Sequence, residues 1–174
     1  NGSYPDFTSG SVVAPYQYCN WTETGTTAVT IDTKNLPLRT NVTLGTSQAT
    51  FTNASALVTL SSGSWPSSLT GERITADGGT TWYTVSAVNS STQITLTANY
   101  TGATTTSNYS LTSPVTIWVA KDFKMENAAT LDIRGNVTIN VRGNAVIKGN
   151  TIVTITTGAL TLQTVGDFTL KNQA

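Results

Sequence analysis

Short runs with an apolar residue at every second position constrain this chain more than any other feature. The central stretch, residues 56–111, contains such runs at Leu57–Leu60, Trp82–Val88 and Thr92–Leu96, separated by Ser, Gly, Asp and Asn. Period-two alternation is typical of half-buried strands, and frequent turn formers favour a small antiparallel barrel or sandwich. Thr, which suits strands that face water on one side, occurs 36 times, so we predict an all-β protein.

The C-terminal part alternates in the same way and is also punctuated by glycines. Between residues 131 and 170 these are Gly135, Gly143, Gly149, Gly158 and Gly166. The spacings of 8, 6, 9 and 8 residues predict short strands joined by turns, arranged either as a β-meander or as a short β-solenoid. Each repeat buries only one or two apolar side chains, so it gains stability by stacking on its neighbours or on other chains.

The N-terminal segment has no steady period. Pro5 and Pro15 disfavour helices and central strands. We predict an extended arm that packs along its own domain or docks on a neighbouring subunit as an added strand. Its candidate subunit contacts are Tyr4, Phe7, Val12, Val13, Tyr16, Tyr18 and Trp21. The predicted parts are therefore an arm at 1–24, a barrel or sandwich at 25–113 and a β-rich region at 114–174, the last two able to pack as one domain.

Composition excludes several classes of function. The net charge is zero, with nine basic and nine acidic residues scattered along the chain, which argues against a nucleic-acid partner. The sequence contains no stretch of 18 apolar residues, so we predict no membrane-spanning helix. Without His there is no Ser-His-Asp triad and no His metal ligand. We therefore predict no catalytic site, cofactor or metal, and expect the weakly charged surface to associate with copies of itself.

Asn-x-Ser/Thr sequences are frequent, which makes glycosylation a further prediction. Besides Asn1, the candidates are Asn20, Asn41, Asn53, Asn89, Asn99, Asn108 and Asn136. The first residue is Asn rather than Met, which indicates either a removed leader or an otherwise processed or trimmed chain; a removed leader would favour secretion. The single Cys19 excludes an intrachain disulfide.

Exposed aromatic rings would indicate a different function, because flat rings stack on sugars. The candidates for sugar stacking are Trp65, Trp82, Tyr83 and Tyr100. Core packing is the commoner fate of such rings.

The central stretch also carries a family resemblance. Its pattern runs G-x-W-P, G-x-x-I, G-x-x-W-Y-T-V, T-Q-I-T-L, Y-T-G-A-T and Y-S-L. The matching residues are Trp65, Pro66, Gly71, Ile74, Trp82, Tyr83, Val85, Ile94, Leu96, Tyr100, Gly102, Tyr109 and Leu111. This pattern resembles a small all-β module of tailed-bacteriophage tail, collar and fibre proteins. The C-terminal run is similar to the octad-repeat β-helix of the trimeric phage tail spikes, although its spacings of 6 and 9 depart from the octad.

The resemblance implies a structural role without catalytic residues. We expect a non-enzymatic subunit of a multi-copy virion or extracellular assembly, held by strand pairing and aromatic packing between copies, with other virion or surface proteins as further partners. The alternative is a secreted bacterial or archaeal surface-filament subunit joined by strand donation. A further alternative is a carbohydrate- or receptor-binding module.

Overall fold

A computed structural model describes the chain except for residues 1–5, 8–15, 36–38, 41–46 and 172–174. About 52% of it is strand and 4% helix, which confirms the all-β prediction. No helix in the described part is long and apolar enough to cross a membrane. The chain divides into two compact units. The first unit combines residues 1–32 with 115–174, and the second comprises residues 33–114.

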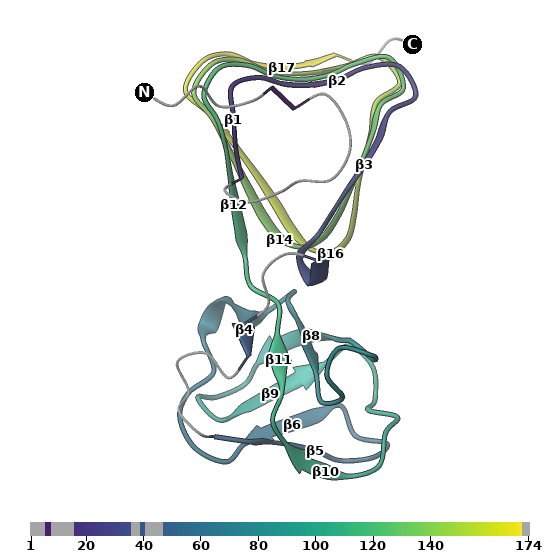
Figure 1. Ribbon diagram of the computed structural model, residues 1–174, viewed down its shortest axis with the longest axis vertical. Helices are drawn as coiled ribbons and strands as arrows, with labels where there is room; N and C mark the ends of the chain where they lie inside the picture. Colours follow the sequence, from purple (N-terminus) through teal and green to yellow (C-terminus); the bar gives the residue numbers. More distant parts are fainter. Residues whose placement is uncertain (1–5, 8–15, 36–38, 41–46, 172–174) are drawn as a thin grey trace. The chain divides into compact units, whose positions relative to one another are not determined.

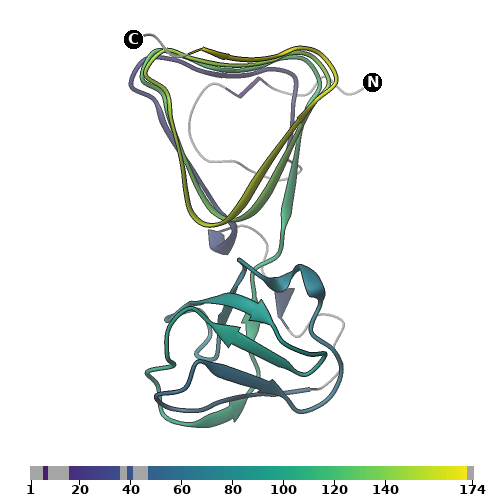
Figure 2. The ribbon, with the colours of Figure 1, turned by 180° about the vertical axis from the view of Figure 1, so that it is seen from behind.

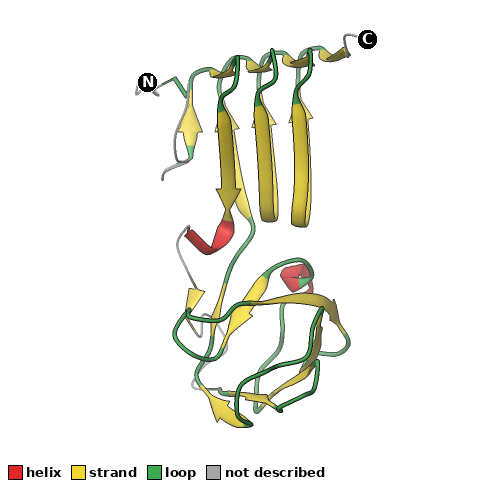
Figure 3. Ribbon diagram, turned by 90° about the vertical axis from the view of Figure 1, so that its right-hand side faces the viewer, coloured by secondary structure: helices red, strands yellow, loops and turns green. Residues whose placement is uncertain are grey.

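The first unit is a parallel β-solenoid with three faces. Its strands are β1 (Gln17–Tyr18), β2 (Trp21–Glu23), β3 (Ala28–Asp32), β12 (Val115–Val119), β13 (Phe123–Met125), β14 (Thr130–Val141), β15 (Ala145–Lys148), β16 (Ile152–Thr164) and β17 (Phe168–Lys171). Every pairing among them is parallel. Viewed end-on they outline a triangle (Figure 1), and from the side successive turns lie next to one another (Figure 3). Parallel pairing identifies the solenoid, because a meander needs antiparallel neighbours.

The three faces are named by their strands. Face 1 contains β1, β12 and the second halves of β14 and β16; face 2 contains β2, β13, β15 and β17; face 3 contains β3 and the first halves of β14 and β16. Val115 pairs with Val137, so that turn takes 22 residues, and Val137 pairs with Leu160, so the next takes 23. The glycine spacing near eight therefore marks single faces of a much longer repeat.

In-register pairing stacks the alternating apolar residues into continuous interior rows. On face 1, Ile117 pairs with Ile139, which pairs with Leu162. On face 3, Ile31, Ile133 and Ile155 form an equivalent row. The first two residues of each row are at most 1% exposed, so the solenoid core is built from residues that occupy the same position in successive turns.

The corners between the faces repeat as well. Gly25, Asn127 and Gly149 occupy the corner between faces 2 and 3 in successive turns, with φ of 69°, 56° and 72°. Only glycine and, less readily, asparagine adopt this left-handed conformation without large cost. At the corner between faces 3 and 1, Gly158 stacks directly on Gly135.

The second unit is an insertion into the first turn of the solenoid. β3 ends at Asp32, which pairs with Arg134, and β12 begins at Val115, which pairs with Val137. In the next turn only two residues lie between those positions, so residues 33–114 replace a two-residue corner. This division differs from the predicted ranges: β1 and β2, from the predicted arm, and β3, from the predicted barrel, form one solenoid turn. β1 and β2 have only two and three residues, too few to show a period.

The inserted unit is an antiparallel sheet curled into a half-barrel, as the central alternation predicts. Its strands are β4 (Arg39–Thr40), β5 (Ala49–Phe51), β6 (Leu57–Leu60), β7 (Arg73–Thr75), β8 (Tyr83–Val88), β9 (Gln93–Leu96), β10 (Thr105–Ser107) and β11 (Ser110–Leu111), with short 3-10 turns η1 (Thr33–Asn35) and η2 (Ser67–Leu69). The sheet order is β10-β5-β6-β9-β8-β7-β11-β4, and its curl is visible in Figure 2. The core contains Phe51, Ile74 and Ile94, each 0% exposed.

A buried polar group joins the two ends of this unit. Glu72 is 0% exposed. Its Oε2 accepts hydrogen bonds from the hydroxyls of Thr33, where the unit begins (3.3 Å), and Thr112, where it ends (2.5 Å). The Thr112 hydroxyl also accepts from the backbone N–H of Arg73 at 2.8 Å. One carboxylate therefore holds the entry and exit segments together.

We predict that Gly158→Ala destabilises the solenoid more than Gly25→Ala. Both glycines have positive φ, but a Cβ at Gly25 would have no neighbour within 4 Å, whereas at Gly158 it would lie 2.8 Å from Cα of Gly135 and closer still to its carbonyl. Gly25→Ala should cost about 1–2 kcal/mol from φ alone, and Gly158→Ala about 1–3 kcal/mol more from overpacking. Urea denaturation followed by circular dichroism measures both; equal losses would contradict the stacked-corner geometry.

The side chain of Glu23 faces the interior of face 2. It is 0% exposed, and neither carboxylate oxygen has a hydrogen-bond partner in the described part of the chain. Burial raises the pKa of this carboxyl above its usual value. The folded state thus binds the proton of Glu23 more tightly than the unfolded state does. The contribution of Glu23 to the free energy of unfolding therefore falls as the pH rises above about 4.5, the ordinary pKa.

Replacing Glu23 by Met, the residue that pairs with it at position 125, should stabilise the protein at pH 7 by about 1–4 kcal/mol. The gain should shrink as the pH approaches 4. Glu126→Gln is the control, because Glu126 is partly exposed and pairs with Lys148 at 3.1 Å; it should change stability by less than about 0.5 kcal/mol. A gain for Glu23→Met that does not vary with pH would contradict a charge-burial cause.

Candidate functional site

The C-terminal turn of the solenoid leaves its apolar interior open. Inward-facing residues in this turn are exposed, with Ile155 at 50%, Phe168 at 54% and Leu170 at 69%, whereas Ile133 and Met125 in earlier turns are 0% exposed. Together they border a depression of about 380 Å³. We call this surface the open end, and it consists of Val153, Ile155, Leu160, Leu162, Phe168 and Leu170. The interior rows of apolar side chains continue from the core to the open end and stop there, with no covering layer among the described residues.

The backbone of the last turn is also unpaired on one side. Within the described residues, β17 pairs only with β15, and β16 pairs only with β14. Such an edge presents free N–H and C=O groups that can pair with another strand. The open end therefore combines apolar side chains with a hydrogen-bonding edge.

A ladder of side chains at the corner between faces 1 and 2 ends at the same place. Asp122 Oδ1 accepts a hydrogen bond from the backbone N–H of Asn144, and Asn144 Oδ1 accepts one from the backbone N–H of Asp167, both at 2.9 Å. The carboxylate of Asp167 is next in the series, and no hydrogen bond to it occurs in the described part of the molecule. It is positioned to accept from the N–H of a further strand.

The opposite end of the solenoid is covered by the chain itself. Phe7, 4% exposed, bridges to Trp21 in parallel, and their ring centroids lie 4.0 Å apart. Tyr18 packs edge-on against both rings. Three of the predicted subunit contacts, Phe7, Tyr18 and Trp21, are thus occupied within their own chain. Tyr16 is partly exposed, and Tyr4, Val12 and Val13 lie outside the described residues.

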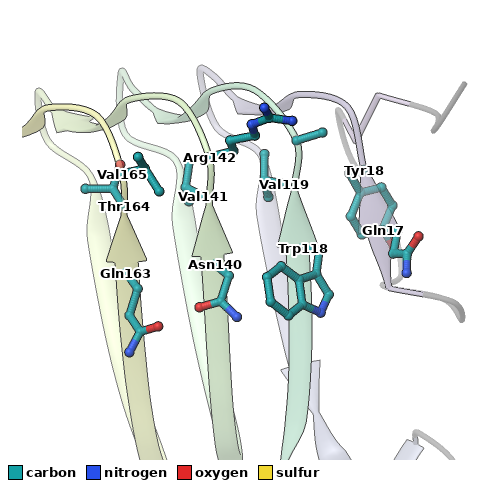
Figure 4. Close-up of a pocket in the computed structure, with 11 residues that line it drawn as sticks. Gln17, Tyr18, Trp118, Val119, Asn140, Val141, Arg142, Gln163, Thr164 and Val165 are labelled. Carbon is teal, nitrogen blue, oxygen red and sulfur yellow. The ribbon is translucent and has the colours of Figure 1, made fainter. Parts of the chain in front are cut away.

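A second feature is a groove of about 640 Å³ on the outside of face 1. Gln17, Trp118, Asn140 and Gln163 pair in register and form one outward row across its four strands. Figure 4 shows the Trp118 indole with its flat face turned outward beside the amides of Asn140 and Gln163. Trp118 is 54% exposed. This outer groove is defined by that row together with Arg142 and Val165 at its end.

The predicted sugar-stacking residues lie elsewhere. Trp65, Tyr83 and Tyr100 are 4%, 8% and 8% exposed in the core of the inserted unit, so little ring surface remains for a ligand. Trp82 is half-buried, and its indole N–H donates to the carbonyl of Gly79 at 2.9 Å. The exposed Trp118 was missed, although alternation carried the signal: Ile117 and Val119 point inward, so Trp118 must point outward.

The predicted glycosylation sites differ in how their amides are used. The side-chain amide of Asn53 donates to the carbonyl of Gly102 at 2.8 Å. The amide of Asn89 donates to Thr95 Oγ1 at 2.7 Å, and that of Asn20 donates to Asp6 Oδ1 at 3.0 Å. Asn99 and Asn108 are exposed, Asn136 is half-buried at a solenoid corner, and Asn41 lies outside the described residues.

Cys19 is a partly exposed free thiol. Across the described ranges, no three His, Cys, Asp or Glu side chains are grouped so as to hold a metal ion.

Comparison with known proteins gave no match. No family model, no curated protein and no solved structure matches the chain.

Proposed function

We propose that this protein is a non-enzymatic structural subunit of a multi-copy assembly, in which copies join by β-strand pairing at the open end. The observation that carries the proposal is the exposure of inward-facing residues such as Ile155, Phe168 and Leu170 in the last turn. Contiguous exposed apolar surface next to an unpaired strand edge favours association. The Asp167 carboxylate adds a hydrogen-bond acceptor at the same edge.

A second copy of the chain fits this edge because β17 is self-complementary. In an antiparallel pair centred on Thr169, Phe168 faces Leu170 of the partner subunit. Asp167 then faces Lys171 of the partner subunit, so opposite charges meet at both ends of the pair. Such a contact is isologous and closes with two-fold symmetry. Cross-strand apolar and opposite-charge pairs each contribute about 0.2–1 kcal/mol.

The setting that we propose is a virion appendage outside the cell. Its support is the resemblance of residues 56–111 to the small all-β modules of phage tail, collar and fibre proteins. The low charge, with nine basic and nine acidic residues in 174, agrees with a surface meant to associate.

The test is the native mass of the purified chain by light scattering over a range of concentrations. The wild type should have a mass above the 18.3 kDa of one chain. Ile155→Glu should give a monomer, because it places a charge on the contact surface. The matched control is Ile152→Glu in the same strand: Ile152 is 57% exposed but faces outward, so this variant should associate as the wild type does.

Charge reversal separates a second copy from other partners. Asp167→Lys and Lys171→Asp should each weaken association several-fold, because each sets like charges opposite one another. The double variant should restore it. A wild-type monomer at all concentrations, or a double variant no better than the single ones, would contradict pairing through β17.

A further inference from the structure

We infer that the outer groove binds a neutral oligosaccharide lying along the solenoid axis. Trp118 supplies the flat apolar surface on which the C–H face of a sugar ring packs. It is 54% exposed, so about half of its surface is open to a ligand. This inference concerns face 1 of the solenoid and does not depend on the association proposed for β17.

The amides beside Trp118 provide the polar half of such a site. Asn140 and Gln163 follow Trp118 on successive strands, and Gln17 precedes it. Strands lie about 4.8 Å apart, a spacing comparable to the length of one sugar ring, so a sugar chain crossing the strands meets a new side chain at each ring. In the described part of the chain, none of these three amides forms a side-chain hydrogen bond. They do not bond to one another across the row, so both their donors and their acceptors are left for a ligand.

The charge of the groove favours a neutral ligand. Among the residues that line it, Arg142 is the only charged one. Amide groups both donate and accept, which matches hydroxyl groups, whereas an anionic polymer calls for several cations. The floor is a parallel sheet whose strands are fixed by the core rows, so the site is preformed and little ordering is needed on binding.

The experiment is a titration of the full chain with three neutral probes: maltohexaose, cellohexaose and mannohexaose. Tryptophan fluorescence and calorimetry are recorded together. Trp118 dominates a ligand-dependent fluorescence change, because Trp21 and Trp65 are 0% and 4% exposed and Trp82 is half-buried. At least one probe should bind. Trp118→Ala should weaken that binding about tenfold or more, and Asn140→Ala and Gln163→Ala should each weaken it several-fold.

Two control variants should bind as the wild type does. Thr116→Ala changes an exposed residue of the same strand that does not line the groove, and Trp82→Phe changes the half-buried indole of the inserted unit. Circular dichroism confirms that each variant is folded. Because Trp118, Asn140 and Gln163 all point outward, their replacement leaves the core rows intact.

Several results would overturn the inference. These are no binding of any of the three probes up to about 10 mM, a range that covers weak affinities, or equal binding by Trp118→Ala. Tighter binding of a hexamer of galacturonic acid than of all three neutral probes would also overturn it, because it would show that charge dominates recognition. Repeating the titration with Ile155→Glu separates the two proposals: sugar binding should persist in this variant whether or not it is monomeric.

Discussion

The structure depends above all on the in-register pairing of each solenoid turn with the next. Pairing places Ile139 between Ile117 and Leu162, where its side chain is fully buried. A single turn buries too little apolar surface to offset the entropy of ordering it, so stability resides in the contacts between turns. The same rule explains the open end: the last turn has the composition of the core but a neighbour on one side only.

The corners explain why the solenoid tolerates an inserted unit. A corner contributes no side chain to the interior rows, so replacing two residues by 82 leaves the pairing of Asp32 with Arg134 and of Val115 with Val137 unchanged. The entropic cost of a long insertion grows only slowly with its length if its ends are held close together. Glu72 meets that condition within the insertion, because it binds both Thr33 and Thr112.

Alternation and turn glycines sufficed to predict an all-β chain, because both are local. They sufficed for the half-barrel too, since strands such as β8 and β9 pair with near neighbours in sequence. The 22-residue turn was not predictable, because alternation does not distinguish parallel from antiparallel pairing. Alternation places the adjacent Trp82 and Tyr83 on opposite faces of a strand but does not show which face is the core, so the buried Tyr83 was chosen as a candidate.

The two proposals constrain each other through symmetry. A two-fold axis that pairs β17 with its copy passes through face 2, so it exchanges faces 1 and 3. The groove of one subunit then faces a surface that lacks the row formed by Gln17, Trp118, Asn140 and Gln163, and it cannot continue across the contact. Association therefore multiplies separate grooves of four positions each and does not build one long groove. A sugar chain that reaches all four positions of one groove gains no further affinity from additional length. A ligand that is displayed many times on one surface gains avidity instead, because it binds several grooves at once.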